Sequence, residues 1–120
     1  MPTTNNLRLY FGPLLIGIIK DQTEREGTWF GTFELAKHKG ADLRDKRLRR
    51  IHQFIEFSVD FHHRVDSGAK ALATEWDRYV DVTGTGQWNT VDSAGHKLHI
   101  QTPTFHTATA LSWEQTNPQP

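Results

Sequence analysis

Cysteine is absent from this chain of 120 residues. Its absence excludes disulfides, thiolate nucleophiles and cysteine-ligated zinc, so any bound metal would need His, Asp or Glu as ligands. Long apolar runs are missing as well, since Leu14–Ile19 is far shorter than the roughly 20 residues of a membrane-spanning helix. Because the amino terminus also lacks a basic segment, the sequence predicts a cytoplasmic protein.

The chain carries no net charge, because 14 Lys and Arg residues balance 14 Asp and Glu residues. The charges are nevertheless unevenly distributed. Residues 1–50 contain ten basic and six acidic side chains, and residues 51–120 contain four basic and eight acidic ones. A balanced total argues against general nucleic-acid binding, whereas polarised charge can orient a partner as it approaches.

Alternating apolar residues, bounded by turn signals, predict two sets of strands. The first set is Leu7–Phe11, Leu14–Ile19 and Thr28–Leu35, with residues 21–27 as a solvated connection. The second set is Trp88–Val91, His96–Gln101 and Phe105–Trp113, the last of them interrupted or at a sheet edge. Gly31 falls on the same face as Trp29 and Phe33, where a glycine leaves room for a ring or a neighbouring backbone.

Apolar residues recur at spacings of three, four and seven between Leu43 and Val65, which is the strongest periodic signal in the chain. They predict a long amphipathic helix, capped by Asp42 and lying flat on a sheet. Gly68 suits the left-handed position after the helix end, and a shorter helix is predicted over Ala69–Val80. We therefore expect a single α+β domain over residues 1–113, in the order β-β-β-α-α-β-β-β, and a disordered tail over residues 114–120.

Four polar residues follow one another along the flank of the long helix. They are His52, Glu56, Asp60 and His63, at spacings of four, four and three. Two imidazoles and two carboxylates in line can bind a divalent ion or act as an acid and a base. The spacing matches no established zinc motif, so a solvated helix flank with His–carboxylate hydrogen bonds is the alternative interpretation.

His62 is different, because helical geometry places it near the centre of the apolar stripe. A buried imidazole tends to stay neutral and needs a hydrogen-bond partner. It is either a core histidine bonded to a strand carbonyl, Tyr10 or Tyr79, or a catalytic base within a pocket.

Five cations lie within seven residues at the start of the long helix: Arg44, Lys46, Arg47, Arg49 and Arg50. The positive end of the helix macrodipole disfavours each of them by roughly a few tenths of a kcal/mol. This local cost indicates an external anionic partner, either an acidic protein surface or a set of phosphates. A solvated basic face is the alternative.

Trp29 and Phe30 point to opposite faces of their strand, so one ring is exposed if one face of the sheet is open. Phe30 and Tyr10 would then form an aromatic contact patch. The sequence contains neither a phosphate-binding loop nor a G-x-S-x-G nucleophile motif.

The leading hypothesis is a small non-enzymatic protein-interaction module without a cofactor. Its predicted contact residues are Arg44, Lys46, Arg47, Arg49, Arg50, Tyr10 and Phe30. One alternative is a metal-binding or acid–base enzyme domain that uses His52, Glu56, Asp60 and His63. The other is nucleic-acid binding through the basic cluster.

Overall fold

The computed structural model describes residues 6–36, 45–84 and 86–115. Three strands precede the long helix α1 (Lys46–Asp66): β1 (Leu7–Phe11), β2 (Leu14–Arg25) and β3 (Thr28–Leu35). A 3-10 helix and a short α-helix follow it, η2 (Ala73–Tyr79) and α2 (Val80–Thr83). Four strands complete the fold: β4 (Trp88–Val91), β5 (Lys97–His99), β6 (Thr104–Thr107) and β7 (Ala110–Glu114). The predicted α+β class and the order of strands and helices are confirmed.

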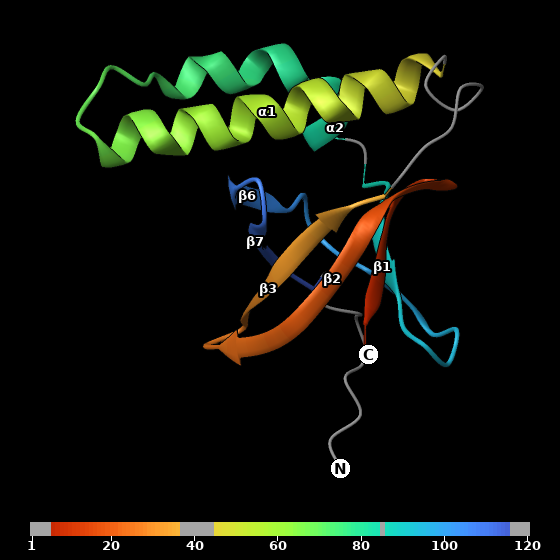
Figure 1. Cartoon of the computed structure of the whole chain (residues 1–120). Coiled ribbons are helices and arrows are strands. Elements are labelled where there is room, and N and C mark those ends of the chain that lie inside the picture. Colours follow the sequence, from red (N-terminus) through yellow and green to blue (C-terminus); the bar gives the residue numbers. More distant parts are fainter. Residues whose placement is uncertain (1–5, 37–44, 85, 116–120) are drawn as a thin grey trace.

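The strands within these ranges form one antiparallel sheet in the order β5-β4-β1-β2-β3-β7-β6. The sheet is strongly curled (Figure 1), and the chain between β5 and β6 is where its two sides meet. At the meeting point the Ile100 N–H donates to the carbonyl of Trp88 in β4 (3.1 Å), and the Gln101 N–H donates to the carbonyl of Glu114 in β7 (2.9 Å). The chain between β5 and β6 therefore joins both edges, and the apolar side chains are enclosed inside.

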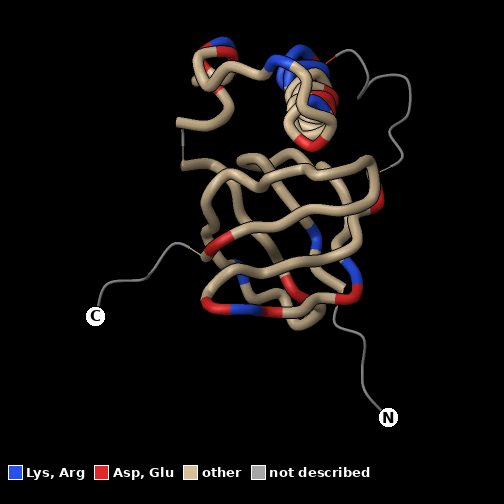
Figure 2. The backbone as a smooth tube through the Cα atoms, turned by 90° about the vertical axis from the view of Figure 1, so that its left-hand side faces the viewer, with Lys and Arg blue, Asp and Glu red and all other residues tan. Residues whose placement is uncertain are grey.

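The helices form a second layer across one end of the curled sheet (Figures 1 and 2). Asp45 caps α1, because its carboxylate accepts hydrogen bonds from the N–H groups of Arg47 (2.8 Å) and Leu48 (3.4 Å). It takes the place of the predicted cap Asp42, which lies outside the described residues. Gly68 adopts a φ of 78° after the end of α1, as predicted. Within the described residues, no helix has the length and apolar composition needed to cross a membrane.

The Phe54 ring connects the helical layer to the sheet. It is fully buried, and its centroid lies 5.7 Å from Tyr79 and 6.0 Å from Trp76, both in η2. It also lies 6.3 Å from Trp88 in β4 and 6.3 Å from Phe105 in β6. Burying a side chain of this size contributes about 1.5–3 kcal/mol to folding. One residue of α1 thus contacts both layers.

The strands differ from the sequence prediction in three places. β5 covers only Lys97–His99 of the predicted His96–Gln101. β2 continues to Arg25 instead of ending at Ile19, because an irregularity between Lys20 and Thr23 lets the pairing with β3 resume. Asp21, within this irregularity, has a φ of 54°. The predicted strand over residues 105–113 is instead the hairpin of β6 and β7.

The second helix and the tail also differ. The predicted helix over residues 69–80 is a 3-10 helix that begins only at Ala73. Glu114, expected in the tail, is the last residue of β7. Residues 116–120 lie outside the described residues. As predicted, Gly31 allows a close approach, since a Cβ there would lie 2.5 Å from Cγ2 of Ile19.

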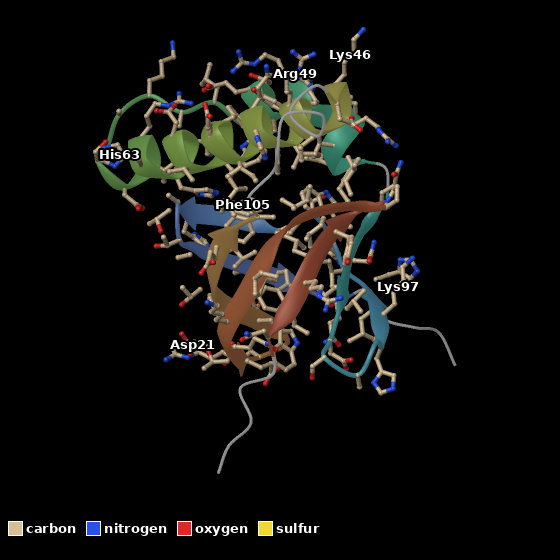
Figure 3. The ribbon with its side chains drawn as sticks, turned by 45° about the vertical axis from the view of Figure 1, so that its right-hand side comes forward. Asp21, Lys46, Arg49, His63, Lys97 and Phe105 are labelled. Carbon is tan, nitrogen blue, oxygen red and sulfur yellow. The ribbon has the colours of Figure 1, made fainter. Side chains whose placement is uncertain are left out.

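Ser58 fastens α1 to the edge strand β6. Its buried hydroxyl donates to the carbonyl of Phe105 (3.1 Å) and accepts from the N–H of the same residue (3.1 Å). Figure 3 shows Phe105 beneath α1. A single hydroxyl therefore provides a hydrogen-bond partner for both the N–H and the carbonyl of Phe105.

We expect Ser58→Ala to lower the free energy of unfolding by about 1–3 kcal/mol, because it leaves a buried donor and a buried acceptor unsatisfied. Denaturant titration measures this loss, and hydrogen exchange at the Phe105 amide should become faster. Ser93→Ala, in the exposed turn before β5, is the control and should change stability by less than about 0.5 kcal/mol. Equal effects of the two substitutions would contradict the role given to Ser58.

Arg64 and Glu75 fasten η2 to α1. The Glu75 carboxylate accepts two hydrogen bonds from the guanidinium of Arg64 (2.7 and 3.0 Å) and one from the Leu72 N–H (2.8 Å). The hydrogen bonds from Arg64, and then the one from Leu72, lower the pKa of Glu75 from 4.5 to about 2.

This lowered pKa predicts a loss of stability in acid. Below pH 4.5 the unfolded chain binds a proton at Glu75 that the folded chain does not yet bind. The contribution of Glu75 is therefore complete above pH 4.5 and is lost as the pH falls toward 2. We expect Glu75→Gln to flatten the dependence of the unfolding free energy on pH in this window, measured by denaturant titration. Glu26→Gln, in an exposed turn, should keep the wild-type slope; a Glu75→Gln slope equal to it would contradict the assignment.

Candidate functional site

Arg50, in the basic cluster of α1, forms an ion pair within the fold. Its guanidinium donates to both carboxylate oxygens of Asp81 (2.9 and 3.0 Å) and lies 4.5 Å from the centroid of the Tyr79 ring. The hydrogen bond from Arg50 lowers the pKa of Asp81. This side chain holds α2 against α1 and is only half-exposed.

The other described cations at the start of α1 face solvent. Lys46 and Arg49 extend from the side of α1 that faces away from the sheet (Figure 3), and they form no salt bridge with any other described residue. Arg47 reaches only its own cap, Asp45, at 3.5 Å. Arg44 lies outside the described residues. Figure 2 shows charged residues concentrated on the helical layer and at the opposite end of the sheet.

A groove of about 450 Å³ lies beside these cations, between the start of α1 and the segment that leads into β4. We call it the basic groove, because three cations and one carboxylate line it over an apolar floor. Its residues are Phe11, Lys46, Arg47, Arg50, Ile51, Asp81, Val82 and Gln87.

The two aromatic residues predicted as a contact patch are far apart. Tyr10 lies opposite Leu15 of β2, and Phe30 lies opposite Thr23 of the same strand. Eight residues of β2 correspond to roughly 25 Å. Phe30 is 38% exposed, but neither ring lines the basic groove. The structure therefore does not bring Tyr10 and Phe30 together.

A larger groove, of about 580 Å³, lies along α1 on the flank that η2 does not cover. We call it the flank groove. Its apolar residues come from β3, α1 and the turn between β6 and β7: Phe33, Leu35, Ile55, Val59 and Ala108. Its polar residues are the four of the predicted stripe: His52, Glu56, Asp60 and His63. The stripe therefore lines one groove.

The members of this stripe differ in their interactions. Asp60 accepts a hydrogen bond from Arg64 at 2.9 Å. The side chains of Glu56 and His63 form no hydrogen bond or ion pair with any other described residue. In the ranges that the structure covers, no three His, Asp or Glu side chains come close enough together to hold a metal ion. The metal alternative therefore gains no support from the described geometry.

His62 is half-buried, as its place in the apolar stripe predicts. Its Nε2 atom is buried and has no hydrogen-bond partner among the described residues, so the expected bond to Tyr10, Tyr79 or a strand carbonyl is not formed. The ring packs instead against Trp76 (centroids 6.0 Å apart) and against His106 of β6 (5.4 Å).

The sequence analysis did not single out His106 or its partner Ser112. The Nε2 atom of His106 lies 2.8 Å from Oγ of Ser112, across the β6–β7 hairpin. No local motif marks this pair, because the contact depends on the register of two strands that the sequence presents as one.

Burial first, and then the neighbouring His106, lower the pKa of His62, while Asp66 on α1 acts in the opposite direction.

Comparison of the chain with protein-family models, with curated proteins and with solved structures gives no match. The functional argument therefore depends on the geometry of the two grooves.

The half-buried His62 predicts that the protein loses stability in mild acid. Its pKa is lowered from 6.5 on folding, so the unfolded chain binds more protons just below pH 6.5. The stability contributed by neutral His62 is complete above pH 6.5 and is lost as the pH falls toward the lowered value. We expect His62→Leu to flatten this dependence below pH 6.5, measured by denaturant titration.

The matched control is His99→Gln, which removes an exposed imidazole on β5. It should keep the wild-type slope. If both variants show the same slope as the wild type, His62 does not couple folding to pH.

Proposed function

We propose that this chain is a non-enzymatic protein-interaction module that binds an acidic surface of another protein through the basic start of α1. The observation that carries the proposal is the solvent-facing cluster of Lys46, Arg47 and Arg49, which no acidic side chain of another element neutralises in the described part of the chain.

Electrostatics support an anionic partner. The first turn of α1 contains no acidic residue, so apart from the cap Asp45 no carboxylate at this end of the helix offsets the macrodipole and the cations. An acidic surface docked there would relieve this repulsion, and the field would accelerate its approach at low salt. Arg50 does not contribute in the same way, because Asp81 already neutralises it.

The shape of the surface favours a protein over a nucleic acid. Phe11 and Ile51 give the basic groove an apolar floor, which suits one anchoring side chain of a partner. No aromatic ring is interleaved with the cations between Lys46 and Arg50, as base stacking would require. The chain as a whole also carries no net positive charge.

The test is the double charge reversal Lys46→Glu/Arg49→Glu, which breaks no interaction among the described residues. We expect a partner captured from native lysate to bind this variant at least about tenfold more weakly, because each reversal places like charges together. Titration calorimetry with the purified partner, over a salt series, measures the loss.

The control is Lys70→Glu/Lys97→Glu, which changes the net charge equally at two exposed sites away from the start of α1. It should bind the partner as the wild type does. Equal capture by both double variants would contradict the proposal. Loss of the captured material after nuclease treatment would point to nucleic acid instead.

A further inference from the structure

We propose that the flank groove is a second binding site, for a small organic cation whose apolar body lies on the groove floor and whose ammonium group pairs with Glu56. This inference is independent of the acidic partner, because the flank groove and the basic groove share no residue.

The floor of the groove provides apolar surface that the fold leaves exposed. Leu35, at the end of β3, is 45% exposed, and Val59 of α1 is only half-buried. Figure 1 shows η2 running beside α1, and the rings of η2 pack on Phe57 and Phe61, on the other flank of the helix. The groove volume of about 580 Å³ falls within the range typical of small-molecule sites.

The charges that line the groove determine which ligand it accepts. None of its described lining residues is Lys or Arg, whereas two are carboxylates. The charge of Asp60 is already offset by Arg64 at 2.9 Å. The Glu56 carboxylate has no such partner among the described residues, so it is the group available to a ligand. An ammonium group complements this site, and a carboxylate would be repelled by it.

The size of the groove selects among cationic occupants. It is bounded by α1, the end of β3 and Ala108 in the turn between β6 and β7. An apolar body of one or two fused rings would cover Leu35 and Val59 and leave its charged group at the rim. The apolar contact then supplies most of the affinity, and the ion pair supplies the preference for one sign of charge.

Three probes of one shape and different charge test the inference: 2-naphthylmethylamine, 2-naphthalenemethanol and 2-naphthoate. Each is titrated into the ¹⁵N-labelled full chain at pH 7.5 and low salt, and amide shifts are followed by NMR. We expect the amine to bind up to about fivefold more tightly than the alcohol, as an exposed ion pair allows, and the naphthoate more weakly than the alcohol. The largest shifts should fall on amides around Leu35, Glu56 and Ala108.

Two variants separate the role of the Glu56 charge from that of the apolar groove floor. Glu56→Gln should make the amine and the alcohol bind equally, while Leu35→Ser should weaken all three probes to a similar degree. Both residues are exposed, so neither change disturbs the core. Glu26→Gln removes the same charge in the turn between β2 and β3 and should keep the preference for the amine.

The proposal is overturned if no probe shifts the amides of the groove, or if naphthoate binds as tightly as the amine. It is also overturned if sedimentation shows a dimer that excludes the probes, because a second copy would then occupy the groove. The Lys46→Glu/Arg49→Glu variant should retain the preference for the amine, so failure here is distinguishable from failure to bind an acidic partner.

Discussion

The packing of the Phe54 ring between the two layers determines how α1 can be used. Phe54 contacts rings of η2, β4 and β6, and Ser58, one turn later, bonds to the backbone of β6. These contacts fix the face that α1 turns toward the sheet. Because η2 occupies one flank of the helix, only the opposite flank and the outward face remain for a ligand or a partner.

The same orientation divides the charged side chains into two kinds. Arg50 and Arg64 face the η2–α2 segment and are neutralised there by Asp81 and Glu75. Lys46, Arg49 and Glu56 are exposed and form no ion pair with another described residue. Residues of the first kind assemble the helical layer, whereas residues of the second kind are available to bind other molecules. The charge reversal at Lys46 and Arg49 and the ligand contact proposed for Glu56 both use residues of the second kind, whereas Arg47 pairs with its own cap Asp45.

The sequence predicts those features that depend on local geometry. The period of α1 identified its buried stripe and the half-buried place of His62 beside it, and the spacing of His52, Glu56 and His63 was enough to place them on one flank. Alternation identified β1, β3 and β4 with their correct bounds. In each case the repeat of the helix or strand relates neighbouring side chains directly.

Features that depend on register or on distant contacts were not predictable in this way. The separation of Tyr10 from Phe30 depends on how β2 pairs with both of its neighbours. The neutralisation of Arg50 requires Asp81, 31 residues later, and the packing of His62 requires His106. A residue-by-residue pattern carries no information about such pairs until the strands and helices are placed in space.

The two grooves depend on different titratable groups for their shape. A change of pH should therefore affect one groove without affecting the other. The flank groove has α1 as one wall and the turn after β6 as another, so it depends on the α1–β6 junction that Ser58 and His62 help to form. The basic groove includes Arg50 and Asp81, an ion pair that lowers the pKa of its carboxylate. Protonation of His62 places a charge in the half-buried α1–β6 junction, against its lowered pKa, whereas the lowered pKa of Asp81 keeps the second ion pair charged. We therefore expect acidification to act on the flank groove at a higher pH than on the basic groove, because the ordinary pKa of histidine lies above that of aspartate.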